Sequence, residues 1–297
     1  MTVSLNICVV GGSGMLGSYL IPYLRGLGHR VFCFSRKCRV GDDNVLVNTD
    51  SDRSLGDALD TCQPSIILNL AALTDVDLCE RDPHQAYLCN VGVVERLSRW
   101  VTKNSNCHLI QISTDHNYDE EGPQSELDIK IKNYYGFSKY AGELAAMSVG
   151  ATVLRTNFFG KSLCAGRQSF SDWSYNALAR RDKISVFEDI FFSPLSMLSL
   201  SECIERVIYN PIPGVFNLGS RKGLSKADFV FKLAHVFDFE TDNVSKVLYR
   251  DQNFSTPRPS DMRMDSTRFE LAYYPGGLPT LEKEINLIIG EYSNEGR

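Results

Sequence analysis

The sequence lacks the features that mark several large classes of protein. It has no block of basic residues, and 36 acidic side chains outnumber 31 basic ones, for a net charge of −5. Nucleic-acid surfaces normally cluster Lys and Arg, so we expect no nucleic-acid partner. No apolar run reaches the ~18 residues that a transmembrane helix needs, so we expect no membrane span either.

Paired cysteines and clustered histidines are also missing. The nine cysteines are odd in number and contain no Cys-x-x-Cys, and the five histidines are dispersed, so we expect no metal site. Cys8, Cys33 and Cys107 stand in apolar runs, where a thiol behaves as a small hydrophobe. The opening MTVSLNICVV has no basic segment or cleavage site and suggests a strand rather than a signal peptide. These features favour a cytoplasmic protein with reduced thiols.

Apolar strand-like runs alternate with helical stretches over the first half of the 297 residues. We expect strands at 5–10, 29–35, 44–47, 64–72, 107–113 and 151–156, and helices ending near 27, at 83–103 and around 133–143. This β-α-β alternation predicts a doubly wound parallel sheet with right-handed crossovers. In such sheets, ligands bind beyond the carboxyl ends of the strands.

The second half is less regular. Helices are expected near 195–209, 225–237 and 280–292, with a strand at 214–218, and Pro/Gly-rich joints divide them. We therefore predict an α/β protein: a Rossmann-like doubly wound parallel sheet with a smaller α/β C-terminal substrate-binding domain. The dinucleotide-binding domain is expected to cover 1–157 with a return segment at 184–210, and the substrate-binding cap to cover 158–183 and 211–297.

The first strand leads into GGSGMLG, which contains Gly11, Gly14 and Gly17 and opens a helix with Met15 and Leu16. Glycine permits a tight turn, then close approach of the backbone to a pyrophosphate, then close contact between helix and strand. The helix N-terminus adds its dipole. A glycine triplet alone is a weak signal, but its place between a strand and a helix is what dinucleotide binding requires. The alternative is a purely structural turn.

The end of the second strand indicates which nicotinamide cofactor is bound. An acidic residue there would bind the ribose 2′-hydroxyl, whereas a cation accommodates a 2′-phosphate. This chain has Ser35, Arg36 and Lys37 at that point, with no carboxylate before Asp42. A charge-assisted contact from Arg36 to a phosphate favours NADP(H). The alternative is a solvated charge in a loop.

The stretch NYYGFSKYAGE, residues 133–143, offers three tyrosines to one lysine. On a helix, Tyr135 and Lys139 lie about 40° apart and one turn from each other. Tyr134 lies about 140° from Lys139, and Tyr140 is its neighbour in sequence, so neither shares its face. The spacing therefore selects Tyr135.

A tyrosine beside a lysine can act as an acid catalyst next to a hydride donor. The ammonium of Lys139 would lower the pKa of the Tyr135 phenol and could also bind the cofactor ribose. A further donor is expected where a carbonyl oxygen gains charge, and the strand at 107–113 runs directly into Thr114 at the ligand-binding edge. The alternative for Thr114 is a polar strand end that caps a turn.

Together these residues resemble the extended short-chain dehydrogenase/reductase family, and within it the dTDP-4-dehydrorhamnose reductase group. The resemblance covers almost the whole chain and rests on GGSGMLG, NLAALTDVDLCE (69–80), ISTDHNYD (112–119), the SELD to NYYGFSKYAGE block (125–143), VLRTNFFG (153–160) and RPSDMRMD (258–265). It implies that Thr114, Tyr135 and Lys139 form the catalytic trio. It also implies that Ala71, Ala72 and Leu73 line the cofactor, and that Thr114 and Asp115 touch the sugar.

Departures from the family pattern gather where the substrate should lie. His116 and Phe158 stand where the family has aromatic residues of other kinds, Asn157 replaces a serine, and residues 189–194 read DIFFSP. Asn48 replaces the acidic residue expected near the adenine. Arg258 is a candidate for the diphosphate because a fork of donors suits that group, although a surface charge is the alternative.

The resemblance implies NADPH-dependent reduction of the 4-keto group of a nucleotide-activated 6-deoxy sugar, with a homodimer as one assembly to test. One alternative is an epimerase or dehydratase on the same scaffold, which would need a further acid–base pair; no glutamate replaces Asp115. The other is an NADP-binding regulatory subunit like the non-catalytic subunit of methionine adenosyltransferase. Retention of all three catalytic residues argues against a purely regulatory role.

Overall fold

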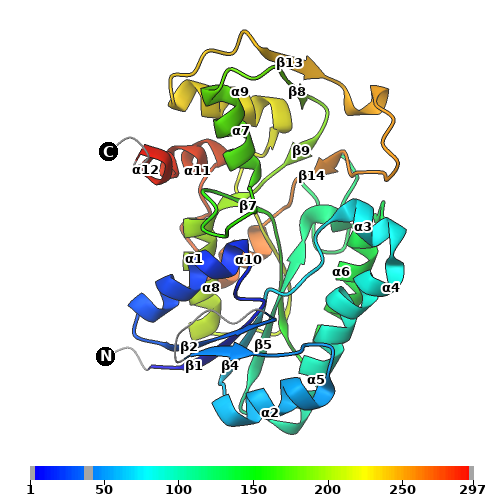
Figure 1. Ribbon diagram of the computed structural model, residues 1–297, viewed down its shortest axis with the longest axis vertical. Helices are drawn as coiled ribbons and strands as arrows, with labels where there is room; N and C mark the ends of the chain where they lie inside the picture. Colours follow the sequence, from blue (N-terminus) through cyan, green and yellow to red (C-terminus); the bar gives the residue numbers. More distant parts are fainter. Residues whose placement is uncertain (1–3, 37–42, 294–297) are drawn as a thin grey trace. The chain divides into compact units, whose positions relative to one another are not determined.

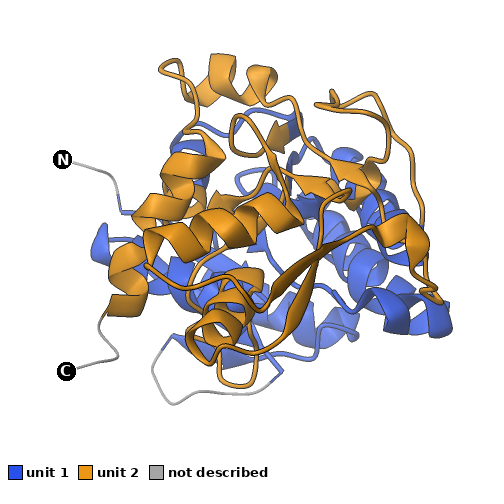
Figure 2. Cartoon of the chain, turned by 90° about the horizontal axis from the view of Figure 1, so that it is seen from above, with its two compact units in different colours: residues 1–114, 133–155, 203–216 blue, residues 115–132, 156–202, 217–297 orange. Residues whose placement is uncertain are grey.

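The computed structural model describes residues 4–36 and 43–293. Contacts within the chain gather it into two compact units (Figure 2): unit 1 comprises 1–114, 133–155 and 203–216, and unit 2 comprises 115–132, 156–202 and 217–297. The domain boundaries expected from the sequence stay a prediction.

A seven-stranded sheet with the order β11-β6-β5-β4-β1-β2-β3 forms the centre of unit 1. The pairings from β3 to β5 are parallel, and β1 lies between β2 and β4, so the strand order reverses on either side of it. The strands are β1 (Asn6–Val10), β2 (Arg30–Ser35), β3 (Asn44–Leu46), β4 (Ile66–Asn69), β5 (His108–Thr114), β6 (Thr152–Thr156) and β11 (Gly214–Leu218). This arrangement confirms the predicted Rossmann-like class.

Helices cover both faces of this sheet, with α1 on one side and α5 and α6 on the other (Figure 1). The helices are α1 (Met15–Gly26), α2 (Asp52–Cys62), α3 (Val76–Arg81), α4 (Pro83–Tyr87), α5 (Val93–Lys103), α6 (Tyr134–Met147) and α8 (Met197–Tyr209). Strand alternation divides the core: Cys8 and Val10 of β1 pack in one cluster with Leu55 of α2 and Leu97 of α5. Burial on both faces explains why the strands read as continuous apolar runs.

The helix predicted at 83–103 is divided. Asp82 caps α4 and Pro83 is its first residue, as the sequence suggested. A π-helical turn at Leu88–Gly92 (η1) then interrupts the regular pattern before α5 begins. π-Helical turns are rare in proteins, and those that occur often lie at functional sites. This one carries the buried Asn90.

Unit 2 is built from short elements around an aromatic core. They are η2 (Asp115–Asn117), β7 (Phe158–Phe159), α7 (Phe170–Ala179), β8 (Ile184–Phe187), β9 (Phe191–Phe192), β10 (Leu195–Ser196), β12 (Leu224–Ser225), α9 (Lys226–Val236), β13 (Val244–Val247), η3 (Tyr249–Asp251), β14 (Asp261–Met262), α10 (Thr267–Tyr273), α11 (Leu281–Leu287) and α12 (Ile289–Tyr292). Phe229 of α9 packs edge-on against Phe159, and Phe192 and Phe170 complete this ring cluster.

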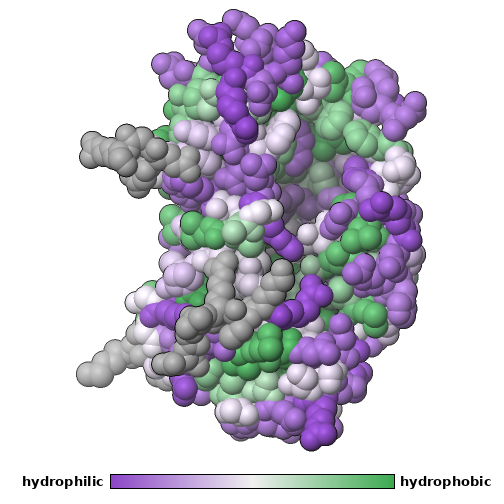
Figure 3. Space-filling view, in the orientation of Figure 1, coloured by the Kyte–Doolittle hydropathy of each residue, from purple (hydrophilic) through white to green (hydrophobic). Residues whose placement is uncertain are grey.

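On the face shown in Figure 3, hydrophobic and hydrophilic side chains are mixed in small patches. No helix within residues 4–36 and 43–293 is long and apolar enough to cross a membrane. The eight cysteines in these ranges are free thiols. In the same part of the chain, no group of three or more His, Cys, Asp or Glu side chains could hold a metal ion.

Candidate active site

The glycine turn after β1 brings the backbone of two strand ends together. Gly11 has φ of +79°, a conformation that favours glycine, and a Cβ built there would lie 2.6 Å from the Ala71 nitrogen. A Cβ on Gly17 would lie 2.4 Å from the Gly12 oxygen, so the start of α1 also packs closely on the turn. The turn therefore has a tight backbone path at Gly11 and close contact with the start of the helix at Gly17.

The N-terminus of α1 follows at the same turn. Gly14 is its N-cap and provides no side-chain capping bond, and no acidic residue stands in the first turn, where Met15 and Leu16 begin the helix. The positive end of the helix dipole is thus not neutralised by its own side chains, which suits a phosphate. Leu16 is buried, so its side chain anchors the helix.

The residues expected at the adenosine end differ in exposure. Ser35 is buried at the end of β2, and Arg36 is exposed directly after it. Burial raises the pKa of the Cys89 thiol, and the positive charge of Arg36 partly opposes this shift. Asn48 is exposed, and its side-chain oxygen accepts the Asp50 N–H at 3.0 Å within a local turn. Lys37 lies outside the described residues.

The loop after β4 is held by a residue that the sequence did not single out. Asn90, in the π-helical turn, accepts the Leu73 N–H at 2.7 Å and donates to the Leu73 carbonyl at 3.1 Å. It also donates to the Ser138 hydroxyl on α6 at 2.9 Å. Ala71, Ala72 and Leu73 are partly buried beside this anchor. The signal in the sequence was an asparagine within the apolar run LCNVGVV, residues 88–94.

Helix α6 carries both Tyr135 and Lys139 on its buried side. Asn133 caps it by accepting the Gly136 N–H at 2.9 Å. Tyr135 is 9% exposed and Lys139 is 4% exposed, so both face inward, whereas Tyr134 and Tyr140 are half-buried. The Tyr135 ring packs in a small apolar cluster that Leu73 also contacts, which links it to the loop after β4.

Lys139 is anchored on the strand that ends at Thr114. Its Nζ donates to the Ile112 carbonyl of β5 at 2.7 Å. Burial lowers the pKa of Lys139 from its ordinary 10.5 to about 8, and the Glu143 carboxylate opposes this shift. Thr114 is 4% exposed at the end of the same strand. The structure thus ties Lys139 to the strand that carries Thr114.

A buried ion pair fixes α6 to the sheet one turn further along. Arg155 of β6 donates to Glu143 of α6 through Nε at 3.0 and 3.1 Å and through Nη2 at 2.6 Å, and both side chains are at most 3% exposed. Ser113 of β5 also donates to Glu143. These contacts join α6, β5 and β6, and sequence reasoning did not find them because the partners are distant along the chain.

Unit 2 contributes a second group of predicted residues. Asn157 donates to the Asp115 carboxylate at 2.6 Å, so two of the expected substrate contacts meet. Burial lowers the pKa of the adjacent His116. The Asp115 carboxylate opposes this shift, whereas the charges of Lys226 and Arg258 lower the His116 pKa further. Phe158 is partly buried in β7. Arg258 is also partly buried, and its Nη1 donates to the Thr256 carbonyl at 2.7 Å.

Lys226 is a residue of this group that sequence reasoning missed. Its Nζ lies 3.5 Å from the ring centroid of Phe192 and 4.3 Å from that of Phe170. Burial lowers the pKa of Lys226 to about 8, and the Asp115 carboxylate opposes the shift. In sequence it stands among ordinary helix residues, so only the fold reveals its proximity to Asp115 and His116.

Comparison with known proteins places the chain in a family. The profile of the RmlD substrate binding domain matches residues 5–293. The chain belongs to this family. The match confirms the resemblance to sugar-nucleotide reductases that the motifs indicated.

Proteins similar in sequence to this chain include a polysaccharide biosynthesis protein and reductases of a nucleotide sugar. The spore coat polysaccharide biosynthesis protein SpsK of Bacillus subtilis is 26% identical over 86% of this chain and 87% of its own. A dTDP-4-dehydrorhamnose reductase of Escherichia coli is 27% identical over 69% of this chain and 67% of its own. A solved dTDP-4-dehydrorhamnose reductase from Bacillus anthracis, in complex with NADP, has a TM-score of 0.87 at 22% identity, covering 97% of this chain and 100% of that one. The likeness supports the fold.

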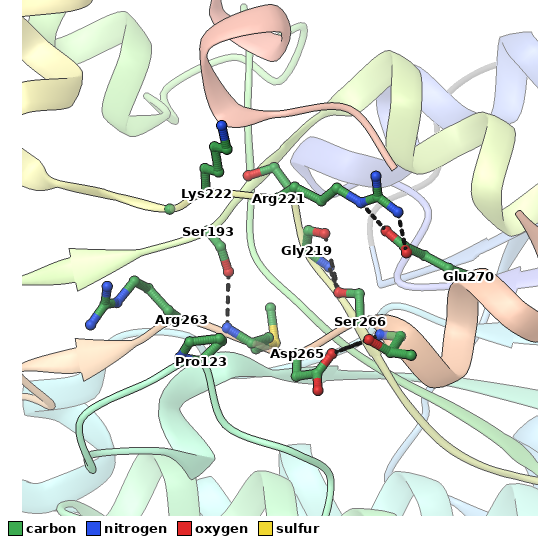
Figure 4. Close-up of a pocket in the computed structure, with 13 residues that line it drawn as sticks. Pro123, Ser193, Gly219, Arg221, Lys222, Arg263, Asp265, Ser266 and Glu270 are labelled. Atoms are coloured by element: carbon green, nitrogen blue, oxygen red, sulfur yellow. Dashed lines mark hydrogen bonds and ion pairs between the residues drawn. The ribbon is translucent and has the colours of Figure 1, made fainter. Parts of the chain in front are cut away.

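This family member also has a polar pocket of about 310 Å³ within unit 2 (Figure 4). Glu270 accepts two hydrogen bonds from Arg221 at 2.8 and 2.6 Å, and Ser193 accepts the Met264 N–H. The Arg263 guanidinium is held by Asp261. None of the predicted site residues lines this pocket, so it adds nothing to the candidate active site.

Proposed function

We propose that this chain is an NADPH-dependent reductase of the 4-keto group of a nucleotide-activated 6-deoxy sugar. The observation that carries this proposal is the placement of Tyr135 and Lys139 on the buried face of α6, with Lys139 bonded to the strand that ends at Thr114. Family membership supports the reaction class, and the named reductases among its relatives support the substrate class.

The residues around the glycine turn fit NADP(H). Gly11 allows the backbone approach that a pyrophosphate requires, and the uncapped start of α1 would favour its charge. Exposed Arg36, at the end of β2, would pair with the 2′-phosphate. We assign Gly14, Met15, Leu16, Gly17, Ser35, Asn48, Ala71, Ala72 and Leu73 to the remaining cofactor contacts. When bound, NADPH supplies the hydride.

The catalytic roles follow from the chemistry of a carbonyl that becomes an alkoxide. Tyr135 would donate its phenolic proton to the developing oxyanion, and the Thr114 hydroxyl would hydrogen-bond to the same oxygen. Lys139 has a pKa near 8, so it carries its charge at neutral pH and would favour the tyrosinate left after transfer. Its bond to the Ile112 carbonyl holds that charge at the strand end.

The substrate contacts are assigned to unit 2. Asp115, oriented by Asn157, would accept hydrogen bonds from sugar hydroxyls. His116 and Phe158 would shape the pocket around the sugar. Arg258 would bind the diphosphate, because a planar fork of donors matches its oxygens.

The test is turnover with a defined substrate. Purified protein is mixed with NADPH and dTDP-4-dehydrorhamnose while the loss of NADPH absorbance is followed. Tyr135→Phe should abolish turnover and retain NADPH binding, and Tyr134→Phe is the matched control that should retain both. Tight NADPH binding with no oxidation by any keto-sugar nucleotide would favour the regulatory alternative. Conversion of the sugar without net NADPH consumption would favour an epimerase or dehydratase.

Assembly and location are part of the same proposal. Phe137 and Leu144 are 50% and 57% exposed and lie seven residues apart on α6, so they share one face that a second copy could cover in a homodimer. Light scattering of the purified protein, compared with Phe137→Ser/Leu144→Ser, tests this. The free thiols fit a reducing compartment such as the cytoplasm.

A further inference from the structure

Lys226 occupies an unfavourable position for a cation. It is the first residue of α9, directly after the N-cap Ser225, whose hydroxyl accepts the Asp228 N–H. The N-terminus of a helix carries partial positive charge, so a lysine at this position is repelled. The dipole therefore gives no reason for a lysine there.

The surroundings of the ammonium compensate only weakly. The faces of Phe192 and Phe170 approach it at 3.5 and 4.3 Å. Within residues 4–36 and 43–293, no acceptor hydrogen-bonds to Nζ and no carboxylate lies within ion-pair distance of 4.0 Å. Aromatic faces attract a cation but accept no conventional hydrogen bond, and Lys226 is only partly buried, so the hydrogen-bonding capacity of its Nζ is not used within the described residues.

A methionine of similar length would fill the same space between the two rings without these costs. A bound ligand that offers an oxygen acceptor to Nζ would restore the missing hydrogen bond, which is the profile of a binding residue rather than a structural one.

The neighbours of Lys226 indicate which ligand it meets. Its charge acts on Asp115 and on His116, two residues assigned above to the sugar. Asp115 follows Thr114 directly in the chain, so this end of the cluster lies next to the residue proposed for the reacting carbonyl. Arg258, with its fork of donors, remains the candidate for the diphosphate.

We propose that Lys226 is a specificity-determining residue that donates a hydrogen bond from Nζ to an oxygen of the sugar unit of the nucleotide sugar. This inference rests on the proposed function. It assigns to α9 a direct contact with the substrate, beside the Asp115–Asn157 pair. A sugar that lacks an acceptor oxygen on that side would bind less well.

The test compares two ligands on two variants. The NADP⁺-loaded protein is titrated by calorimetry with dTDP-rhamnose and, separately, with dTDP. Lys226→Met should weaken dTDP-rhamnose binding about tenfold or more, the value of a hydrogen bond to a charged group, and leave dTDP binding unchanged. In turnover, KM should rise by a similar factor with kcat little changed. Lys232→Met, on the same helix where the lysine pairs with Glu282 and its side chain is 39% exposed, is the matched control and should change neither.

Stability separates a binding role from a structural one. Lys226→Met should unfold at the same or a higher temperature than the wild type, because it removes a partly buried charge that the N-terminus of α9 repels. A variant that is less stable and binds dTDP-rhamnose normally would overturn the inference, as would an equal loss for dTDP-rhamnose and dTDP. A wild type that binds no nucleotide sugar at all would refute the proposed function itself, and this inference with it.

Discussion

The buried pair between Glu143 and Arg155 offers a sharp test of how the site is held together. Arg155→Met would leave the Glu143 carboxylate buried without its cationic partner, while the Ser113 hydroxyl still donates to it. The pair has three N–H···O contacts of 2.6–3.1 Å, and its side chains are 3% and 1% exposed. Removing one partner of such a pair costs about 3–5 kcal/mol, because an uncompensated charge remains in the interior.

The measurement is urea-induced unfolding at neutral pH, with the midpoint and slope compared between variants. The matched control is Arg99→Met, because Arg99 also has a 2.7 Å contact with a carboxylate, that of Asp52, but both side chains are more than half exposed. That loss should stay below about 1 kcal/mol. Adding Glu143→Gln to Arg155→Met should recover part of the stability, since the second change removes the stranded charge.

Equal losses for the buried and the exposed pair would refute this reasoning. So would a double variant less stable than Arg155→Met alone, because that would mean the cost comes from packing rather than from the stranded charge. Either result would weaken the view that α6 is fixed to β5 and β6 by electrostatics. The placement of the tyrosine and lysine would then depend on apolar packing and on the hydrogen bonds of Ser138 and Lys139.

Three further predictions follow from the site. Gly11→Ala should abolish NADPH binding in a fluorescence titration, because its Cβ would meet the Ala71 backbone at 2.6 Å; retained affinity would exclude the proposed cradle. Asn90→Ala should raise the Kd for NADPH by releasing the loop at Leu73, and an unchanged Kd would assign Asn90 to packing. Folding lowers the pKa of Lys139 from 10.5 to about 8, so the unfolded chain binds more protons than the folded one between these pH values. The unfolding free energy of the wild type, measured relative to that of Lys139→Met, should therefore rise by about 3 kcal/mol from pH 8 to 10.5. A difference that does not change with pH would contradict this.

The fold was predictable because its signals are local. The glycine triplet, the apolar strands and the Tyr-x-x-x-Lys spacing each need only a few consecutive residues, and the strand expected at 214–218 has those bounds in the structure. Helix α2 was missed although its signals were present: Ser51 caps it, and Leu55 and Leu59 are spaced for one buried face. There the weak overall hydrophobicity hid a regular pattern.

The residues that hold the site in place were not predictable in this way. Asn90 joins a π-helical turn to a loop and to α6, and Glu143 joins a helix to a strand that follows it. Each is an ordinary polar residue in its own segment, and its partner is fixed by the tertiary fold alone. The roles assigned to Thr114 and Tyr135 remain predictions, because position and burial support them but chemistry must decide.

Buried Lys139 and partly buried Lys226 show how the contacts of a lysine decide its use. Burial lowers the pKa of Lys139 and of Lys226 to about 8 in each case. Lys139 has the Ile112 carbonyl as acceptor, so its charge is held in place before any ligand arrives. Lys226 has only the two aromatic faces, so its hydrogen-bonding capacity remains available to a ligand. A similar lowering of the pKa thus accompanies different contacts, which suit Lys139 to a preorganised catalytic role and Lys226 to recognition of the substrate.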